Sequence, residues 1–253
     1  MEQLAKKMEV QNISKTFFTK EDSFTAIENV SFDVHEGEFL VILGPGRCGK
    51  TVLLNIIAGL LEKTTGTVSY EGKEITGVNT EVGMVFQKTA LMPFKTVMEN
   101  VELGLKFSGM EKKARREICQ KYIELVGLHG FEKSYPKALS GGMKQRVGIA
   151  RAYANNPKVL IMDEPFGALD AQTRYLMQNE ILRIWEHEKR TVIYVTNNIE
   201  EAIYLGTRIV LLSKCPAKVK AIYEVDLPRP RDMVGKEFMA LREQISNDTD
   251  LSV

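Results

Sequence analysis

Hydrophobic side chains recur along this chain in two patterns, the alternation typical of strands and the spacing typical of helices. Residues 8–13 and 26–34 predict two strands that flank the core as an antiparallel pair, and the second alternates apolar and polar positions in Val-Ser-Phe-Asp-Val. Residues 39–43 are all apolar, which predicts a fully buried strand, and residues 51–60 predict the helix that follows it.

The rest of the chain continues this alternation after a helical stretch. Residues 96–153 have low β-propensity and helically spaced apolar positions, so we expect helices there. A helix is expected over 172–189, then an extended Leu-Pro-Arg-Pro-Arg-Asp segment and an amphipathic helix over 233–245 near the end. Strands that alternate with helices favour an α/β fold with a largely parallel central sheet. Three further buried strands are expected, at residues 159–163, 191–196 and 208–212.

The composition excludes several classes of protein. The chain is 44% hydrophobic and 26% charged, with a formal net charge of +1, which is typical of a globular protein and gives little attraction for nucleic acid. The longest mostly apolar run, residues 52–61, is far shorter than the roughly 20 residues of a membrane-spanning helix. We also expect no cleaved secretory signal. The three cysteines lack a metal-binding or disulfide spacing and fit a reducing, cytosolic compartment.

Residues 44–51 read Gly-Pro-Gly-Arg-Cys-Gly-Lys-Thr and match the GxxxxGK[ST] phosphate-binding loop, between a predicted strand and a predicted helix. Backbone N–H groups of such a loop converge on phosphate oxygens, and the helix N-terminus adds a partial positive charge. We expect Lys50 to reach the β- and γ-phosphates of a nucleotide and the Thr51 hydroxyl to bind Mg²⁺. Arg47 either contacts phosphate or extends into solvent. The other expected phosphate-binding residues are Gly44, Pro45, Gly46, Cys48 and Gly49.

Two carboxylates end the predicted strand over residues 159–163. Successive residues at a strand end point in different directions, so the two acids can have different roles. We expect Asp163 to hold hydrated Mg²⁺ and Glu164 to point toward the γ-phosphate, where a base would orient an attacking water.

A third motif, Leu-Ser-Gly-Gly-Met-Lys-Gln-Arg at residues 139–146, opens a predicted helix. The backbone N–H groups at this helix N-terminus are free to bind an anion, although by itself the pattern equally fits an ordinary helix cap. The candidate anion-binding residues are Ser140, Gly141 and Gly142.

Together these three motifs resemble the ATP-binding subunits of ABC transporters, and the resemblance covers nearly the whole chain. It implies a single domain over residues 1–253 with the P-loop NTPase fold. Within it we expect a RecA-like core with an antiparallel β flank, a helical subdomain and a C-terminal extension. Their expected bounds are 1–95 with 156–225 for the core, about 96–155 for the subdomain and 226–253 for the extension.

The resemblance also implies roles for residues outside the three motifs. Phe17 occupies the position of the aromatic that stacks on adenine, although a core aromatic at a strand end is the alternative. Gln87 matches the glutamine that senses the γ-phosphate and Mg²⁺, and Asp170 matches the loop where two subunits meet. The family forms head-to-tail dimers of identical or different subunits, in which Ser140 and the glycines after it close over the partner's ATP.

Asn197 and Asn198 depart from the family pattern, which has a switch histidine followed by an aspartate. An asparagine side chain donates a hydrogen bond but has no proton equilibrium at physiological pH. We therefore expect ATP binding to persist and hydrolysis to be slow. The loop sequence Gly-Pro-Gly-Arg, where many relatives have Gly-Pro-Ser-Gly, also favours slow hydrolysis.

Residues 87–94 contain Leu91, Met92 and Phe94 around a proline. They either pack against the chain's own helical lobe or, as the resemblance implies, contact the coupling helix of a transmembrane permease subunit. Several segments most resemble the ATPase subunits of bacterial nitrate, aliphatic sulfonate and taurine importers. That resemblance implies an ATP-powered importer for a small anion, with a periplasmic or lipid-anchored solute-binding protein as an indirect partner.

The implied location is peripheral, on the cytoplasmic side of the inner membrane. The alternative function is a hydrolysis-impaired regulatory partner subunit, which Asn197 favours. We expect no nucleic-acid partner, because the net charge is only +1 and no coiled-coil insertion is present.

Overall fold

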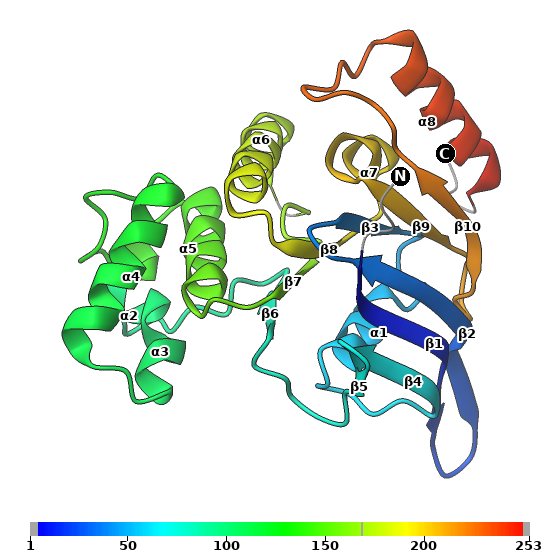
Figure 1. Cartoon of the computed structure of the whole chain (residues 1–253), viewed down its shortest axis with the longest axis horizontal. Coiled ribbons are helices and arrows are strands. Elements are labelled where there is room, and N and C mark those ends of the chain that lie inside the picture. The colour runs from blue at the N-terminus through cyan, green and yellow to red at the C-terminus, as the bar shows by residue number, and fades with distance from the viewer. Residues whose placement is uncertain (1–4, 168, 250–253) are drawn as a thin grey trace. The chain divides into compact units, whose positions relative to one another are not determined.

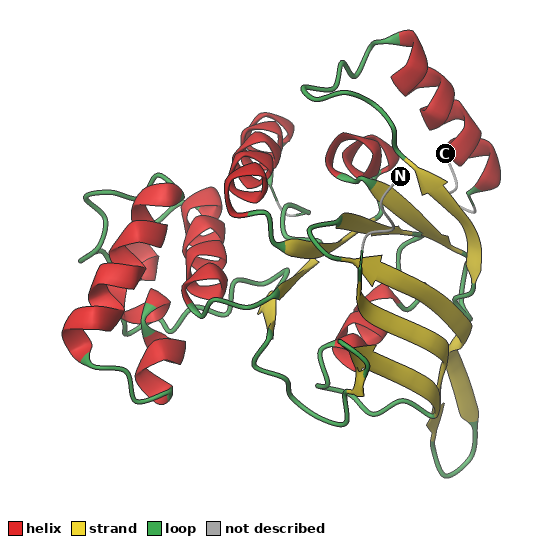
Figure 2. Cartoon of the chain, in the orientation of Figure 1, coloured by secondary structure: helices red, strands yellow, loops and turns green. Residues whose placement is uncertain are grey.

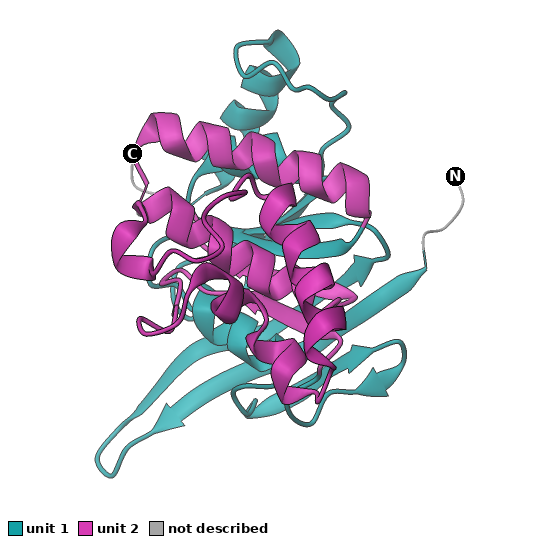
Figure 3. Cartoon of the chain, turned by 90° about the vertical axis from the view of Figure 1, so that its left-hand side faces the viewer, with its two compact units in different colours: residues 1–79, 190–253 teal, residues 80–189 magenta. Residues whose placement is uncertain are grey.

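A computed structural model describes residues 5–167 and 169–249. It combines helices and strands throughout (Figure 2), in agreement with the predicted α/β class. The chain divides into two compact units, which we describe separately. Unit 1 contains Met1–Asn79 with Arg190–Val253, and unit 2 contains Thr80–Lys189 (Figure 3).

The first sheet of unit 1 is antiparallel. It is built from β1 (Lys6–Phe18), β2 (Ser23–His35), β4 (Thr65–Tyr70) and β5 (Lys73–Glu74), in the order β2-β1-β4-β5 (Figure 1). The predicted antiparallel pair of β1 and β2 is confirmed, and both strands are longer than expected. Sequence analysis did not identify β4 and β5, which are short; β4 is only partly buried and β5 is exposed.

The second group of strands in unit 1 forms the buried core of the unit. The strands β3 (Phe39–Leu43), β8 (Thr191–Thr196) and β9 (Arg208–Leu212) are parallel and fully buried, as their continuous apolar runs predict. The strand β10 (Val219–Glu224) pairs with β9 in the antiparallel direction. The helices of this unit are α1 (Lys50–Ile57), α7 (Ile199–Leu205) and α8 (Lys236–Asp248).

Helix α1 ends earlier than the predicted 51–60. Gly59 has φ +71, and a methyl group added there would lie 1.9 Å from the Gly77 carbonyl oxygen. The chain therefore turns out of the helix at a position that only glycine can occupy.

Unit 2 contains the predicted helical insertion and one pair of parallel strands. The strands are β6 (Val82–Val85) and β7 (Val159–Asp163), of which only β7 was predicted. The helix expected over 172–189 is α6 (Ala171–Glu188), whose apolar residues Met177, Ile181, Ile184 and Trp185 are buried. The helices are α2 (Val97–Val101), α3 (Leu103–Phe107), α4 (Lys112–Leu125), the 3₁₀ helix η1 (Pro136–Ala138), α5 (Gly141–Ala154) and α6 (Ala171–Glu188).

In the described ranges 5–167 and 169–249, we find no helix with the length and apolar character needed to span a bilayer.

Candidate nucleotide site

The lysine loop connects the buried strand β3 to helix α1. Gly49 has φ +115, and a Cβ atom there would lie 2.9 Å from the Ala26 carbonyl oxygen, so the loop requires glycine at this position. No side chain caps the N-terminus of α1. Its N-cap residue is Gly49, and backbone N–H groups at a helix N-terminus are suited to an anion such as a phosphate.

Lys50 is the first residue of α1, and its side chain turns back into the loop. The Nζ atom donates hydrogen bonds to the carbonyl oxygens of Gly44 at 2.9 Å and Pro45 at 2.7 Å. The residue is buried, so its ammonium group lies inside the loop that the motif assigns to phosphate.

Arg47 adopts a left-handed backbone conformation with φ +62. A non-glycine residue in this conformation costs about 1 kcal/mol, and Arg47 occupies the last position of the Gly-Pro-Gly-Arg segment that departs from Gly-Pro-Ser-Gly. Its side chain is exposed and makes no hydrogen bond or ion pair with any described residue. The arrangement agrees with the solvent-exposed interpretation of this residue.

Asn197 and the lysine loop leave the sheet of unit 1 at the same edge. The parallel strands β3 and β8 pair in register with Leu43 opposite Thr196, so Gly44 and Asn197 follow directly at neighbouring strand ends. Asn197 is exposed, and the structure gives its side chain no hydrogen bond within the described residues. The pairing of β3 with β8 thus brings together Gly44 and Asn197, which are far apart in the sequence.

Asn198 has a structural role that an aspartate would also fill. It is the N-cap of α7, and its side-chain oxygen accepts a hydrogen bond of 2.7 Å from the Glu201 backbone N–H. Asparagine and aspartate are about equally good N-caps. Sequence analysis did not identify α7, although an asparagine followed three residues later by a glutamate is a recognisable helix start.

Phe17 lies near the end of β1, opposite Phe24 of β2. Its side chain is 38% exposed, which contradicts the alternative of a core aromatic. The Lys15 Nζ atom lies 5.1 Å from the ring centroid. An exposed aromatic ring of this kind offers a surface on which a base can stack.

The carboxylates of unit 2 lie at the end of β7. Asp163 is buried at the last position of the strand, and Glu164 follows it with φ +40, a strained conformation for a glutamate. Gln87 leaves the neighbouring strand β6 in parallel register. A methyl group added at Gly167 would lie 3.6 Å from the Gln87 Nε2 atom and 3.9 Å from the Glu164 Cβ atom, so the structure brings these two side chains together.

The Ser-Gly-Gly motif and Asp170 also lie together within unit 2. Ser140 is the N-cap of α5, and its hydroxyl accepts a hydrogen bond from Met143 N–H at 3.2 Å. Asp170 is the N-cap of α6 and accepts hydrogen bonds from Thr173, which lower the pKa of its carboxyl. A methyl group at Gly142 would lie 3.2 Å from the Thr173 Cγ2 atom, so two helix N-termini adjoin each other.

Comparison with known proteins shows the family to which this chain belongs. A family model described as ABC transporter matches residues 27–167. The chain belongs to the ABC transporter family.

Three relatives support this assignment over most of the chain's length. An uncharacterised ABC transporter ATP-binding protein of Methanocaldococcus jannaschii is 49% identical and covers 95% of this chain and 90% of its own length. The aliphatic sulfonates import ATP-binding protein SsuB of Bacillus cereus is 42% identical and covers 93% of both chains. A putative ATP-binding protein of Brucella abortus is 46% identical and covers 88% of this chain and 86% of its own length.

Two solved structures show the same fold. This chain is similar to the dimeric structure of a bacterial ABC transporter cassette, with a TM-score of 0.77 and 34% identity, covering 86% of this chain and 98% of that one. It is also similar to a dimeric post-hydrolysis structure of an ATP-binding cassette bound to ADP and phosphate, with a TM-score of 0.76, 33% identity and the same coverage. The predicted P-loop NTPase fold is therefore confirmed, and the chain is an ATP-binding and ATP-hydrolysing subunit of an ABC transporter.

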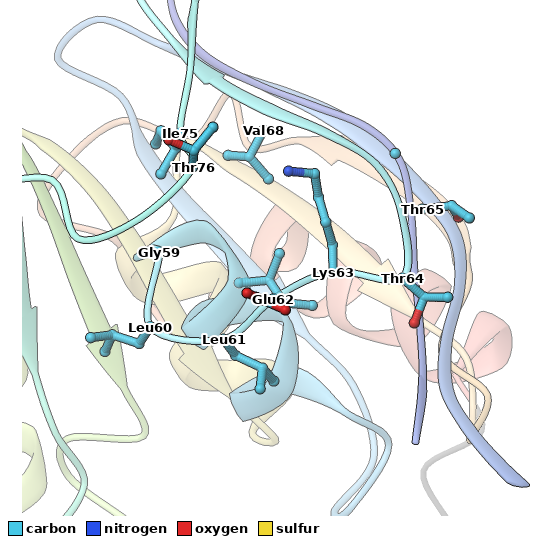
Figure 4. A pocket seen from close by; sticks show the side chains of 12 residues that line it. Gly59, Leu60, Leu61, Glu62, Lys63, Thr64, Thr65, Val68, Ile75 and Thr76 are labelled. Carbon is cyan, nitrogen blue, oxygen red and sulfur yellow. The ribbon is translucent and has the colours of Figure 1, made fainter. Parts of the chain in front are cut away.

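The ABC subunit also has a hollow in unit 1 that is separate from the lysine loop. It has a volume of about 560 Å³ and lies between the turn after α1, the strand β4 and the segment that follows β5 (Figure 4). The residues that line it include Leu60, Lys63 and Ile75, and none of the predicted site residues is among them. This hollow is therefore no part of the candidate nucleotide site.

Proposed function

We propose that this ABC ATPase powers an importer for a small anion of the sulfonate, taurine or nitrate class. The observation that carries the proposal is the match to SsuB of Bacillus cereus, at 42% identity over 93% of each chain. The solute does not touch the ATPase subunit in importers of this kind, so the proposal rests on likeness along the whole chain.

The proposed docking surface for the permease is the exposed part of residues 87–94. Phe94 is 90% exposed and Met92 is 44% exposed, which argues against burial of these two side chains in the chain's own helical lobe. The segment is nevertheless held firmly, because buried Asn100 exchanges hydrogen bonds with Met92 and donates one of 3.0 Å to the Lys95 carbonyl oxygen. A firmly held, exposed apolar cluster suits a permanent protein partner.

For catalysis, we propose that Lys50 binds the β- and γ-phosphates and that Glu164 orients the attacking water. Oxygen donors suit Mg²⁺, and those of Thr51, Asp163 and Gln87 would complete its coordination with phosphate oxygens and water. The ion would neutralise charge on the transferring phosphate.

The proposed active form is a head-to-tail dimer, with the partner being either a second copy or a homologous subunit. The adjoining helix N-termini at Ser140 and Asp170 would face the ATP held by the other subunit. The likeness to a dimeric cassette structure at 34% identity supports a dimer. The subunit would then be peripheral on the cytoplasmic side of the inner membrane, with the solute-binding protein as an indirect partner and no nucleic acid.

A second candidate function is a hydrolysis-impaired regulatory subunit. Asn197 favours it, because an asparagine stands where the family's switch histidine would meet the γ-phosphate. The strained Arg47 backbone in the lysine loop adds to this case. Such a subunit would close on ATP and leave turnover to a competent partner.

The test is ATP hydrolysis by the purified protein and by Glu164→Gln, with nucleotide binding measured in parallel. Turnover that Glu164→Gln abolishes while binding remains supports the working ATPase. Tight binding without turnover in either protein, even with the native permease subunits, supports the regulatory subunit. With the permease in liposomes, stimulation by a binding protein loaded with taurine, an alkanesulfonate or nitrate tests the solute class. Stimulation by none of them contradicts the proposed importer.

A further inference from the structure

Helix α7 follows the switch position Asn197 directly, and its C-terminal end is bound by two arginines of the C-terminal extension. The last carbonyl groups of a helix have no partner within it. Arg229 donates hydrogen bonds to the carbonyl oxygens of Tyr204 at 3.0 Å and Leu205 at 2.5 Å. Arg231 donates to Ile203, to Tyr204 at 3.2 Å and to Gly206 at 2.5 Å.

Arg231 is itself anchored within the extension. The residue is 8% exposed, and its guanidinium group also donates to the carbonyl oxygens of Val225 at 3.0 Å and Leu227 at 3.3 Å. All three nitrogens of the guanidinium group thus donate to backbone carbonyls, of the extension on one side and of α7 on the other. A buried cation at a helix C-terminus also complements the helix dipole.

The extension reaches the first turn of α7 as well. Arg242 of α8 donates a hydrogen bond of 2.9 Å to the Glu200 carboxylate, and α8 packs against α7 (Figure 1). Helix α8 is held by its buried residues Phe238 and Ile245 and by a hydrogen bond from the Tyr223 hydroxyl to Asp248. The C-terminal extension therefore contacts both ends of α7, a helix of only seven residues.

The N-terminus of α7 in turn determines where Asn197 sits. Asn198 caps the helix, and its backbone N–H donates to the Thr196 hydroxyl at 3.1 Å. The Thr196 hydroxyl donates to the Glu201 carboxylate in the first turn of α7. Asn197 lies between Thr196 and Asn198, so a shift of the helix would move it relative to the neighbouring lysine loop.

We propose that Arg229 and Arg231 are positioning residues for hydrolysis, which hold α7 so that Asn197 stays in place beside the lysine loop. The proposal rests on the proposed role of Asn197 at the γ-phosphate. A helix of this length has little stability of its own, so its position depends on such contacts. Loosening the arginines should lower turnover without weakening nucleotide binding, because the loop that holds the phosphates is untouched.

The test is a double-mutant cycle between the extension and the switch position. Arg229→Gln and Arg231→Gln are each measured alone and together with Asn197→Ala, by kcat, KM, labelled-ATP affinity and thermal melting. We expect each arginine variant alone to lower kcat by roughly tenfold to a hundredfold, as small misplacements of reacting groups do, with nucleotide affinity changed by less than about twofold. When either arginine variant is combined with Asn197→Ala, kcat should fall no further than in Asn197→Ala alone.

Two control variants separate positioning from folding. Arg229→Lys keeps the charge beside the carbonyls and should recover most of the turnover lost in Arg229→Gln. Lys236→Gln removes an exposed charge from the same extension and should leave kcat unchanged. A loss of kcat that is the same with and without Asn197→Ala overturns the positioning role, as does a loss of melting temperature with kcat unchanged. Absence of turnover in the parent and in Asn197→His would overturn both this proposal and the proposed hydrolytic function.

Discussion

Replacing Asn197 by histidine should raise ATP turnover and leave the fold unchanged. Asn197 is exposed, and within the described residues its side chain makes no hydrogen bond, so the substitution removes no hydrogen bond. The register of β3 and β8 places the new imidazole at the same edge of the sheet as Gly44. Removing one hydrogen-bond donor to developing charge typically costs about 2.7 to 4 kcal/mol, or a factor of 10² to 10³ in rate. Since asparagine still donates one hydrogen bond, that factor is the upper limit of the expected gain.

The matched control is Asn198→Asp, which restores the other family residue. Both side chains accept the Glu201 N–H at the N-terminus of α7, so we expect the free energy of unfolding to change by less than about 0.5 kcal/mol and kcat to stay the same. The parent, Asn197→His and Asn198→Asp are compared by phosphate release at saturating Mg-ATP, by labelled-ATP binding and by thermal melting. If Asn197→His hydrolyses ATP no faster than the parent, with affinity and melting unchanged, then Asn197 does not limit turnover.

Three further predictions concern the lysine loop and the docking surface. Gly49→Ala adds a methyl group 2.9 Å from a carbonyl oxygen at φ +115, so ATP affinity should fall at least about tenfold and stability by about 1 to 2 kcal/mol; Gly77→Ala, outside the loop and with nothing within 4 Å, is the control. Arg47→Gly relieves the φ +62 strain, and partial compensation by unfolded-state entropy leaves a stability gain of less than about 1 kcal/mol in chemical denaturation. Phe94→Asp should abolish co-purification with the permease subunits while ATP affinity stays unchanged. Val234 is similarly exposed, and Val234→Asp should change neither co-purification nor ATP affinity. Equal loss of co-purification and of ATP affinity in Phe94→Asp would contradict the docking role.

The amino-acid sequence by itself determined the parts of this protein that depend on local interactions. The run 39–43, the loop 44–51 and the helix after it were predictable because burial pattern, glycine positions and helix N-terminus all lie within one short segment. The acidic pair at the end of β7 and the helix start at Ser140 were predictable for the same reason. The end of α1 was misplaced because the close approach of Gly77 to Gly59 is a tertiary contact.

Tertiary structure decided everything that depends on strand pairing and on which surface stays uncovered. Asn197 lies beside Gly44 only because β3 pairs with β8, and strand order is not a local property. The exposure of Met92 and Phe94 follows from the buried Asn100 that holds their segment, since an apolar cluster in the sequence does not reveal whether it is covered. The contacts of Arg229 and Arg231 with α7 join segments about 25 residues apart. Their partners are backbone carbonyls, which every residue carries, so no pattern of side chains could have identified them.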